Sequence, residues 1–426
     1  MRLRQRSLVA YVSVAHALIH TIEITYAVLL SRIGDEFGVG LFVLGIVANV
    51  FAFTFGFSAL PSGVLVDRLG TQRVLFIAFS TAAVAALLVA TSPNPVVLGL
   101  FLGLLGLSIG LYHPAGLALI AQVAAQGGGT AGRGLALGWH GVAGNLGIAA
   151  APALAIGVAV AFDWRWAYVL LAVLAALVAV SLRFVRLEEA EAPSEQPAEP
   201  ASAQPATATS VATRSRLRTL MPLLLVYGVF VLNGFVYRGS LTFLPTHLED
   251  RLSISVLGLS EESLDAALIT AALLAGAVGQ IFGGVLSERY RLERLAVPLT
   301  LSMLPFLLLI ATTSGLPLVL FAALFVFANF SSQPVYTGLI ADYAPKGAIG
   351  RSYGISFFAA FGLGSVAATF AGFFADRWGT GSVFFLLSAF LVVTTALALA
   401  IWQLSERAPP RTPAHGEPSA AGWGGE

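Results

Sequence analysis

Twelve long apolar segments, separated by short polar turns, dominate this chain of 426 residues. Each is long enough to cross the hydrocarbon core of a bilayer, which needs about 20 residues of helix. We expect them at residues 8–33, 41–66, 73–91, 96–125, 133–161, 164–184, 219–247, 264–287, 295–313, 317–343, 351–375 and 379–403. The sequence therefore predicts an all-α membrane protein with twelve transmembrane helices.

The composition excludes several other classes of protein. The chain is 57% hydrophobic and only 11% charged, whereas a soluble protein is about a quarter charged. It has no cysteine, which rules out disulfides and thiol chemistry. It also has no Gly-x-x-x-x-Gly-Lys phosphate loop, so we expect neither an ATP-driven pump nor a bound cofactor.

The two halves of the chain repeat each other. Residues 63–68 (Gly-Val-Leu-Val-Asp-Arg) recur as residues 284–289 (Gly-Val-Leu-Ser-Glu-Arg), and the Gly-Arg pair at 132–133 recurs at 350–351. The separations of 221 and 218 residues nearly agree, which predicts two pseudo-symmetric six-helix bundles. Paired bundles of this kind hold a site at their midplane interface and rock around it.

The repeat and the composition together predict the domain boundaries. We expect the bundles at residues 1–186 and 217–407. Residues 187–216 are rich in Glu, Pro, Ala and Ser and have few large apolar side chains, so they predict a disordered cytoplasmic linker. Residues 408–426 have a similar composition and predict a disordered cytoplasmic tail.

The basic residues predict the orientation in the membrane. Eighteen of the 23 lie at the termini or in the loops on the same side, four lie on the opposite side, and Arg238 lies inside a span. Cytoplasmic loops carry the excess of Arg and Lys, so we expect both termini in the cytoplasm of a multi-pass plasma-membrane protein. The first span lacks a cleavage site and is expected to be retained.

Two obligate charges lie deep in the apolar spans, Glu23 in the first and Arg238 in the seventh, at equivalent positions of the repeat. A charge at membrane depth is costly and commonly faces a cavity or a partner. One interpretation is that Glu23 takes up and releases a proton while Arg238 anchors an anionic or polar substrate, or the carboxylate itself. The alternative is a permanent ion pair that holds the two helices together.

Histidines accompany Glu23. His16, His20 and Glu23 share one helix face because they lie at i, i+4 and i+7, and His113 lies in the fourth span. Because histidine titrates near physiological pH, we predict these four side chains to be proton-coupling residues. Their nitrogen and oxygen atoms also suit a divalent metal, which leaves metal transport as an alternative. A membrane di-iron enzyme would need about twice the histidines present, so we do not expect an enzyme.

The loop after the second span resembles a family signature. Residues 63–70 read Gly-x-Leu-x-Asp-Arg-x-Gly, and Arg73 follows, similar to the loop motif of the major facilitator superfamily. The resemblance covers the whole chain and implies a cytoplasmic latch between the bundles, although Thr71 and Gln72 stand where basic residues usually follow. The residues expected to form this gate are Gly63, Asp67, Arg68, Gly70, Arg73, Glu288 and Arg289. A third copy of the pattern, residues 372–379, falls on the opposite side, and we treat it as coincidence.

A narrower resemblance rests on His16, on residues 112–116 (Tyr-His-Pro-Ala-Gly) and on residues 141–147 (Gly-x-x-Gly-Asn-x-Gly). These motifs resemble the fosmidomycin-resistance branch of the superfamily, whose members are proton-driven exporters of small drugs. In this superfamily helices one, four, seven and ten line the cavity, with two, five, eight and eleven beside them. The expected cavity residues are then Arg238, His113, His140, Asn145, Asn233, Tyr237, Asn329, Gln333 and Tyr336.

These observations together predict a proton-coupled secondary transporter with alternating access that exports small drug-like or organic anionic compounds. The alternatives are an uptake symporter for an organic anion, a divalent-metal transporter and a sensor that keeps the fold but moves nothing. The expected partners are a small-molecule substrate, protons and the lipid bilayer. We expect no nucleic acid and a monomeric chain.

Overall fold

The computed structural model describes residues 3–125, 130–185, 210–252, 260–345 and 349–407. Regular structure in these ranges is helical throughout, and twelve of the helical segments are long and apolar enough to cross a membrane. This confirms the prediction of an all-α protein with twelve transmembrane helices.

The first half of the chain supplies six crossings. Its helices are α1 (Leu3–Val28), α2 (Leu30–Phe37), α3 (Leu41–Leu69), α4 (Thr71–Ala90), α5 (Pro95–Gly110), α6 (Tyr112–Ala125), α7 (Thr130–Ala161) and α8 (Trp164–Ser181). The fourth crossing is divided between α5 and α6, and α2 is a short helix between the first two crossings. Arg165 donates two hydrogen bonds to the Glu36 carboxylate, 2.6 and 2.7 Å long, which tie α2 to α8 and hold the pKa of Glu36 below its usual range.

The second half repeats this plan. Its helices are α9 (Ser210–Arg251), α10 (Glu261–Arg289), α11 (Leu292–Thr312), α12 (Gly315–Tyr343), α13 (Ile349–Phe357), the π-helical turn η1 (Phe358–Gly362), the 3₁₀ turn η2 (Leu363–Ser365), α14 (Val366–Trp378) and α15 (Gly381–Arg407). The fifth crossing of this half runs through α13, η1, η2 and α14 without a gap.

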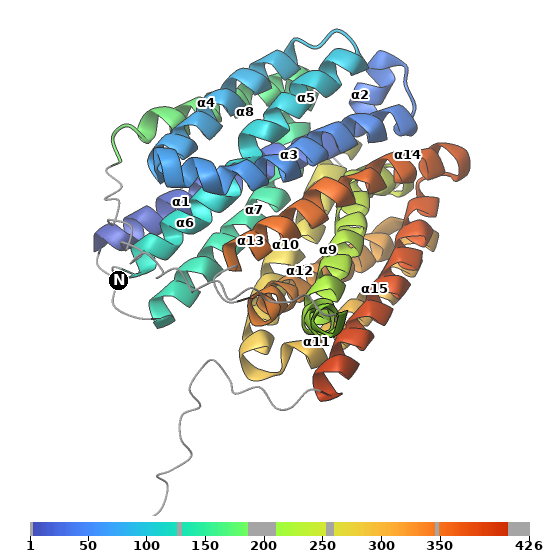
Figure 1. Cartoon of the computed structure of the whole chain (residues 1–426). Helices are drawn as coiled ribbons and strands as arrows, with labels where there is room; N and C mark the ends of the chain where they lie inside the picture. Colours follow the sequence, from blue (N-terminus) through green and yellow to red (C-terminus); the bar gives the residue numbers. More distant parts are fainter. Residues whose placement is uncertain (1–2, 126–129, 186–209, 253–259, 346–348, 408–426) are drawn as a thin grey trace, which may run out of the picture.

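Figure 1 shows the two halves as separate bundles that lie side by side, one blue to green and the other yellow to red. They meet chiefly along two helix pairs, α3 with α14 and α7 with α10. Each pair joins the second crossing of one half to the fifth crossing of the other, as a two-fold relation between the bundles requires. We call the end of the bundles where α1 begins and α15 ends the inner end, following the expected orientation, and the opposite end the outer end.

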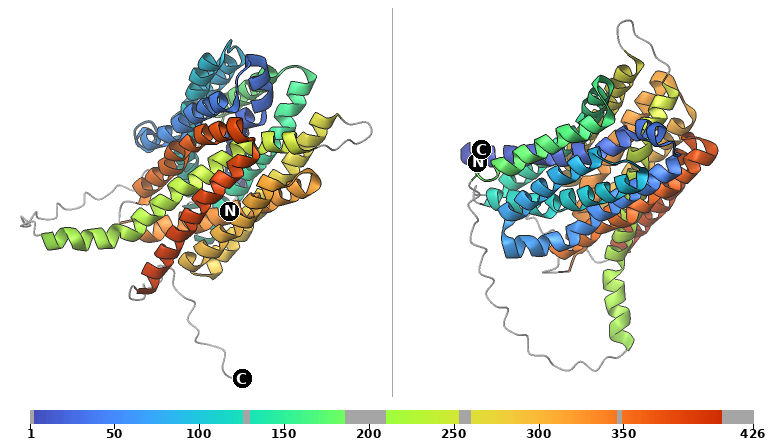
Figure 2. Two further views of the ribbon diagram at one scale, coloured as in Figure 1. Left: turned by 90° about the vertical axis from the view of Figure 1, so that its right-hand side faces the viewer. Right: turned by 90° about the horizontal axis from the view of Figure 1, so that it is seen from above.

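Helix α9 begins at Ser210, inside the segment expected to be a linker. Residues 210–216 are therefore helical, and in Figure 2 the first turns of α9 project away from the other helices. Residues 187–209 of the expected linker, and the expected tail at 408–426, lie outside the described residues.

The fourth crossing is interrupted at Leu111, where α5 ends and α6 begins. Pro114 has no backbone N–H, so it cannot bond the carbonyl of Gly110 four residues earlier. By contrast, α7 runs through Pro152 and α12 through Pro334 as single helices.

Glycines show where the bundles touch. A Cβ atom on Gly45 of α3 would lie 2.4 Å from the carbonyl oxygen of Ala368, and one on Gly56 would lie 2.2 Å from the backbone nitrogen of Gly362. Nothing lies within 4 Å of such an atom on Gly63, near the inner end of the same helix. Helix α3 therefore lies against the opposite bundle along its outer and middle parts and separates from it toward the inner end.

Candidate functional site

The two deep charges meet across the bundle interface. Nη1 of Arg238, on α9, lies 2.8 Å from Oε1 of Glu23, on α1. Their side chains are 6% and 0% exposed. An uncompensated charge at this depth would be strongly unfavourable, so each side chain holds the other in place at the point where the two halves of the molecule meet.

One edge of the Arg238 guanidinium has no partner. Among the described residues, no hydrogen-bond acceptor lies within reach of its Nε or Nη2, and both atoms are shielded from solvent. These two N–H groups lie on the same side of the planar group and point in parallel, the arrangement that binds both oxygens of a carboxylate or phosphate. Arg238 therefore pairs with Glu23 through Nη1, while Nε and Nη2 form a bidentate donor edge with no partner among the described residues.

Aromatic rings surround the same guanidinium. Its Cζ lies 4.8 Å from the ring centroid of Phe361, 5.3 Å from that of Phe55 and 5.7 Å from that of Tyr237. Such contacts stabilise a cation, more so away from water. Phe361 belongs to the π-helical turn η1, and π-helical insertions are frequent at functional sites.

A chain of hydrogen-bonded groups leads from Glu23 toward α7. Oε2 of Glu23 lies 2.5 Å from Nδ1 of His20, and Nε2 of His20 lies 3.1 Å from Nε2 of His16. Nδ1 of His16 lies 2.8 Å from the backbone carbonyl oxygen of His140. The structure thus brings together three of the four predicted proton-coupling residues in one buried file.

His113, the fourth, lies beside this file. Its ring centroid is 5.3 Å from that of His16 and 5.2 Å from that of His20, and its buried Nε2 has no hydrogen-bond partner among the described residues. The ring of His140 stacks on His16 with centroids 3.8 Å apart. Both residues were predicted to line the cavity, and the ring of each contacts at least one histidine ring of the proton-coupling file.

The three imidazoles of His16, His20 and His113 also bring one nitrogen atom each within 4.8 Å of one another. This is the donor set that the metal alternative would need. Nε2 of His16 and Nε2 of His20, however, form a hydrogen bond with each other. Arg238 adds a positive charge on the far side of Glu23, which opposes a second cation.

Small residues let α7 approach the file. A Cβ atom on Gly144 would lie 2.7 Å from Cε1 of His16 and 2.9 Å from Cδ2 of His20. One on Gly147 would lie 2.0 Å from the carbonyl oxygen of Ala17. Glycine at these positions is therefore what allows the His140 carbonyl to reach His16.

The neutral side chains predicted for the cavity are dispersed. Asn145 is buried where α7 meets α10, and its amide nitrogen donates to the carbonyl of Gly141 over 3.1 Å. Asn329 is buried, while Asn233 and Gln333 are partly exposed. The hydroxyl of Tyr336 lies 2.5 Å from that of Thr300 on α11, so in this conformation it is engaged inside the second bundle.

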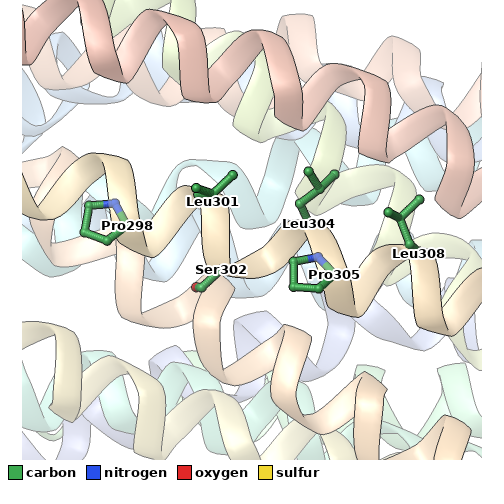
Figure 3. Close-up of a pocket in the computed structure, with 6 residues that line it drawn as sticks. All are labelled: Pro298, Leu301, Ser302, Leu304, Pro305 and Leu308. Atoms are coloured by element: carbon green, nitrogen blue, oxygen red, sulfur yellow. The ribbon is translucent and has the colours of Figure 1, made fainter.

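The cavity beside the ion pair is small. Glu23 and Arg238 line a space of about 20 Å³, together with residues of α3 and α14. About 10–15 Å³ accommodates one water molecule, so this space does not hold an organic substrate. A larger depression of about 450 Å³ lies on α11, lined by Pro298, Leu301, Ser302, Leu304, Pro305 and Leu308 (Figure 3). It contains no charged side chain and none of the predicted site residues.

The side chains predicted to form the inner latch make no hydrogen bond or ion pair with one another among the described residues. Asp67, Arg68, Arg73, Glu288 and Arg289 are exposed, and none forms an ion pair or side-chain hydrogen bond within the part of the chain that the structure describes. Gly70 ends α3 with a φ of 81°, a conformation that favours glycine. Among the described residues no latch closes the inner end, and the open space around Gly63 indicates an opening there.

The outer end is closed by contacts between the bundles. Arg32 pairs with Glu262 over 2.6 Å, and the hydroxyl of Ser31 donates to Glu249 over 2.8 Å. In both cases a residue of α2 contacts a residue of the second half. The conformation is therefore closed at the outer end and open at the inner end.

Asp376 adds a third outer contact that the sequence analysis missed. Its carboxylate accepts hydrogen bonds from the backbone N–H groups of Leu41 and Phe42, 2.7 and 2.8 Å long, at the first turn of α3 in the other bundle. Asp376 is the acidic residue of the third copy of the loop motif, residues 372–379. The acidic residue of this copy thus contacts the opposite bundle at the outer end, where the motif near Asp67 is expected to do so at the inner end.

Comparisons with known proteins agree with this architecture. A sequence model of the Major Facilitator Superfamily matches residues 12–369 and 252–424. A hexuronate transporter of Bacillus subtilis (strain 168) is 27% identical over 252 residues, which amount to 56% of this chain. The match spans 57% of that relative's length, somewhat over half.

Solved structures share the fold at low identity. A bacterial homolog of the human lysosomal transporter Spinster, in an inward-facing and unoccupied conformation, superposes with a TM-score of 0.74 at 13% identity, covering 96% of this chain and 98% of that one. A D-xylose–proton symporter superposes with a TM-score of 0.73 at 14% identity, covering 93% and 97%.

Proposed function

This chain belongs to the Major Facilitator Superfamily, and we propose that within it the protein transports small organic anions coupled to protons. Membership and fold make it a membrane-spanning transporter of a small-molecule substrate rather than an enzyme. The proposal concerns the substrate class, the coupling ion and the residues responsible.

The unpartnered edge of Arg238 carries the proposal. A buried guanidinium with two free parallel donors is unfavourable until an acceptor arrives, and a carboxylate satisfies both donors at once. The aromatic side chains around Arg238 suit the carbon skeleton of such a substrate. A hexuronate, the substrate class named for the B. subtilis relative, carries one carboxylate.

The proposed coupling of protons to substrate rests on the position of Glu23 between Arg238 and His20. Its carboxylate contacts both Arg238 and His20, so a change in its protonation alters the charge that an incoming anion meets at Arg238. Export by proton antiport and uptake by proton symport, the two directions predicted from the sequence, both use this contact. The sign of the proton dependence separates them.

The test uses purified full-length protein in liposomes and radiolabelled D-glucuronate, with D-glucose as the neutral control of similar size. We expect exchange of glucuronate but not of glucose. Arg238→Lys keeps the charge beside Glu23 but loses the forked edge, and we expect it to weaken glucuronate exchange about tenfold, equivalent to about 1.4 kcal/mol. Equal exchange of both sugars, or wild-type exchange by the lysine variant, would overturn the anion assignment.

The same liposomes report coupling and direction. Glucuronate accumulation driven by a proton gradient of the same direction as the sugar flux indicates symport, and accumulation driven by the opposite gradient indicates antiport. Exchange with no response to either gradient would remove proton coupling while leaving the anion assignment in place.

A further inference from the structure

The file from Glu23 to His140 contains three successive hydrogen-bond contacts. They join the His140 carbonyl to His16, His16 to His20, and His20 to Glu23, over 2.8, 3.1 and 2.5 Å. The four residues are 3–8% exposed, and each contact joins its two atoms directly, at hydrogen-bond distance. Each contact therefore requires one hydrogen between its two atoms.

Counting hydrogens determines the protonation of the file. The carbonyl of His140 only accepts, so Nδ1 of His16 must donate to it. Two neutral imidazoles bring two N–H groups, and an ionised Glu23 brings none. Two hydrogens cannot satisfy three contacts, because one contact would then press two lone pairs together at hydrogen-bond distance.

We propose that this file is the store for the coupled proton and that the conformation with the inner end open is its loaded form. The inference rests on the proton coupling proposed above and assigns the extra proton to His16, His20 and Glu23 together. Three arrangements satisfy all contacts: the proton resides on His16, on His20, or on the Glu23 oxygen that faces His20. All three contain one proton more than neutral imidazoles with an ionised carboxylate.

The surrounding groups are consistent with a single stored proton. Arg238 on α9 contributes a positive charge that Glu23 offsets, and the neutral phenol of Tyr237 lies beside it. From α6, Tyr112 donates its hydroxyl hydrogen to the carbonyl of Val12 over 2.6 Å, and His113 leaves its Nε2 free. From α7, the ring of His140 stacks on His16.

Release of the proton must open the file. With two hydrogens left, either α1 shifts from the His140 carbonyl on α7, or Glu23 turns from His20 toward Arg238. Helix α7 packs against α10 of the other bundle, so the first route couples proton loss to movement between the bundles. The released proton passes to water at the open inner end, and no other bond changes. His16 is then a positioning residue. If its Nε2 carries no hydrogen, Nε2 of His20 must carry one, and if its Nε2 donates, Nε2 of His20 must accept.

Nitrogen NMR of the full-length protein with ¹⁵N-labelled histidine, in liposomes at pH 7.5 without substrate, tests the count directly. The variants His16→Gln and His20→Gln assign the signals among the six histidines of the chain. We expect three of the four ring nitrogens of His16 and His20 to carry hydrogen, or one hydrogen to be shared at the contact with Glu23. Two bare nitrogens, one on each ring, with an ionised Glu23 by infrared spectroscopy, would overturn the proposal.

Addition of equimolar Zn²⁺ to the same sample separates a proton from a metal. We expect the ring signals to remain unchanged. Loss of hydrogen from the facing nitrogens with tight Zn²⁺ binding would overturn the proton assignment in favour of a metal site.

Transport supplies a second readout. In His16→Gln the amide can donate to His20, so the file no longer needs the extra proton. We expect the midpoint of the pH profile of gradient-driven glucuronate transport to move about one unit toward acid, while glucuronate exchange persists. His247→Gln is the matched control, because His247 lies on α9 near the outer end and bonds Thr380 and the carbonyl of Ile310 instead. An unchanged profile in His16→Gln would count against the proposal.

The two proposals fail separately. If the wild-type protein does not exchange glucuronate, the anion assignment fails whatever the hydrogen count is. If it exchanges glucuronate but the file holds only two hydrogens, the proton store fails and the anion assignment stands.

Discussion

At the scale of single residues, Glu23 connects two parts of the site, because each of its carboxylate oxygens contacts a different partner. One oxygen faces Arg238 at 2.8 Å and the other faces His20 at 2.5 Å. The first contact crosses the bundle interface, and the second lies within one turn of α1. A single carboxylate therefore links the closure of the interface to the protonation of the histidines.

Substitution of Glu23 by Gln separates these roles. The amide cannot ionise, so we expect gradient-driven transport of glucuronate to fall to the level without a gradient, at least about 100-fold below the wild type, as is typical for loss of a proton-transfer group. Exchange should persist, because Arg238 is still present. The measurement is driven uptake beside exchange in the same liposomes, and driven transport that survives would make the carboxylate structural.

Gly144 provides a test of the histidine geometry. In Gly144→Ala the added methyl group would meet His16 at 2.7 Å, so the ring must move and the contact with the His140 carbonyl must lengthen. We expect a loss of stability of about 1–3 kcal/mol from overpacking, seen as a lower Tm, together with impaired driven transport.

The control for this variant lies on the same helix. Nothing lies within 4 Å of a Cβ atom on Gly157, so Gly157→Ala should leave transport unchanged and keep or slightly raise the Tm. Equal behaviour of the two variants would show that the close approach of α7 to His16 is not required.

At the scale of helices, α3 is held at its first turn by the other half of the molecule. The first N–H groups of a helix have no partner within it and carry partial positive charge. Asp376 supplies a carboxylate to two of them from α14. Opening of the outer end would break this cap, so its free energy favours the closed outer end.

Replacement of Asp376 by Ala should shift the population toward an open outer end. Loss of a cap costs about 1 kcal/mol, which changes a two-state ratio roughly fivefold. We would measure the rate at which an impermeant maleimide, added from the outer side, labels the thiol of an Ala48→Cys variant, since Ala48 is buried and lines the small cavity. Asp35→Ala is the control, since Asp35 is also exposed near the outer end. Equal labelling in both variants would argue against a latch.

At the scale of the whole molecule, the proposed transport requires this structure to be one conformation of a cycle. The outer contacts of Ser31 and Arg32 are made, whereas Asp67 and Glu288 form no ion pair with any described residue, and α3 separates from the other bundle near Gly63. Alternating access requires the opposite pattern in the next conformation. Each outer contact must therefore break in every cycle.

Cross-linking the outer end should stop the cycle. The chain has no native cysteine, so Ser31→Cys with Glu249→Cys gives one reactive pair where the side chains now lie 2.8 Å apart. With a short bifunctional thiol reagent we expect glucuronate exchange to fall to background and to recover after reduction. The single-cysteine variants, treated alike, should remain active. Full activity of the cross-linked protein would mean that the outer contact is not broken during transport.

Most of the architecture and the centre of the site are predictable from the sequence. Apolar length gives the crossings, and the rarity of deep charge singles out Glu23 and Arg238. Helical period places His16 and His20 on the same face as Glu23. Each of these signals either is local in sequence or depends on the free-energy cost of burying a charge. That cost is the same for any arrangement of the helices.

The remainder depends on packing between distant segments. Phe361 contacts Arg238 from the π-helical turn η1, and no proline in the sequence marks that turn. The hydroxyl of Tyr336 finds Thr300 on the neighbouring helix, which no spacing within its own helix reveals. The contact of Asp376 with the first turn of α3 is not predictable from the third motif copy, since nothing local shows that the two segments lie side by side.

The small space beside Glu23 and Arg238 has a consequence for binding affinity. With about 20 Å³ available, the conformer described here admits a water molecule and no cargo, so binding must draw on a more expanded conformer. The apparent dissociation constant is then the intrinsic one divided by the fraction of molecules in that expanded form. Any substitution or lipid that stabilises the compact form will therefore raise the melting temperature and weaken apparent affinity together, and selection for thermostable variants will favour poorer binders.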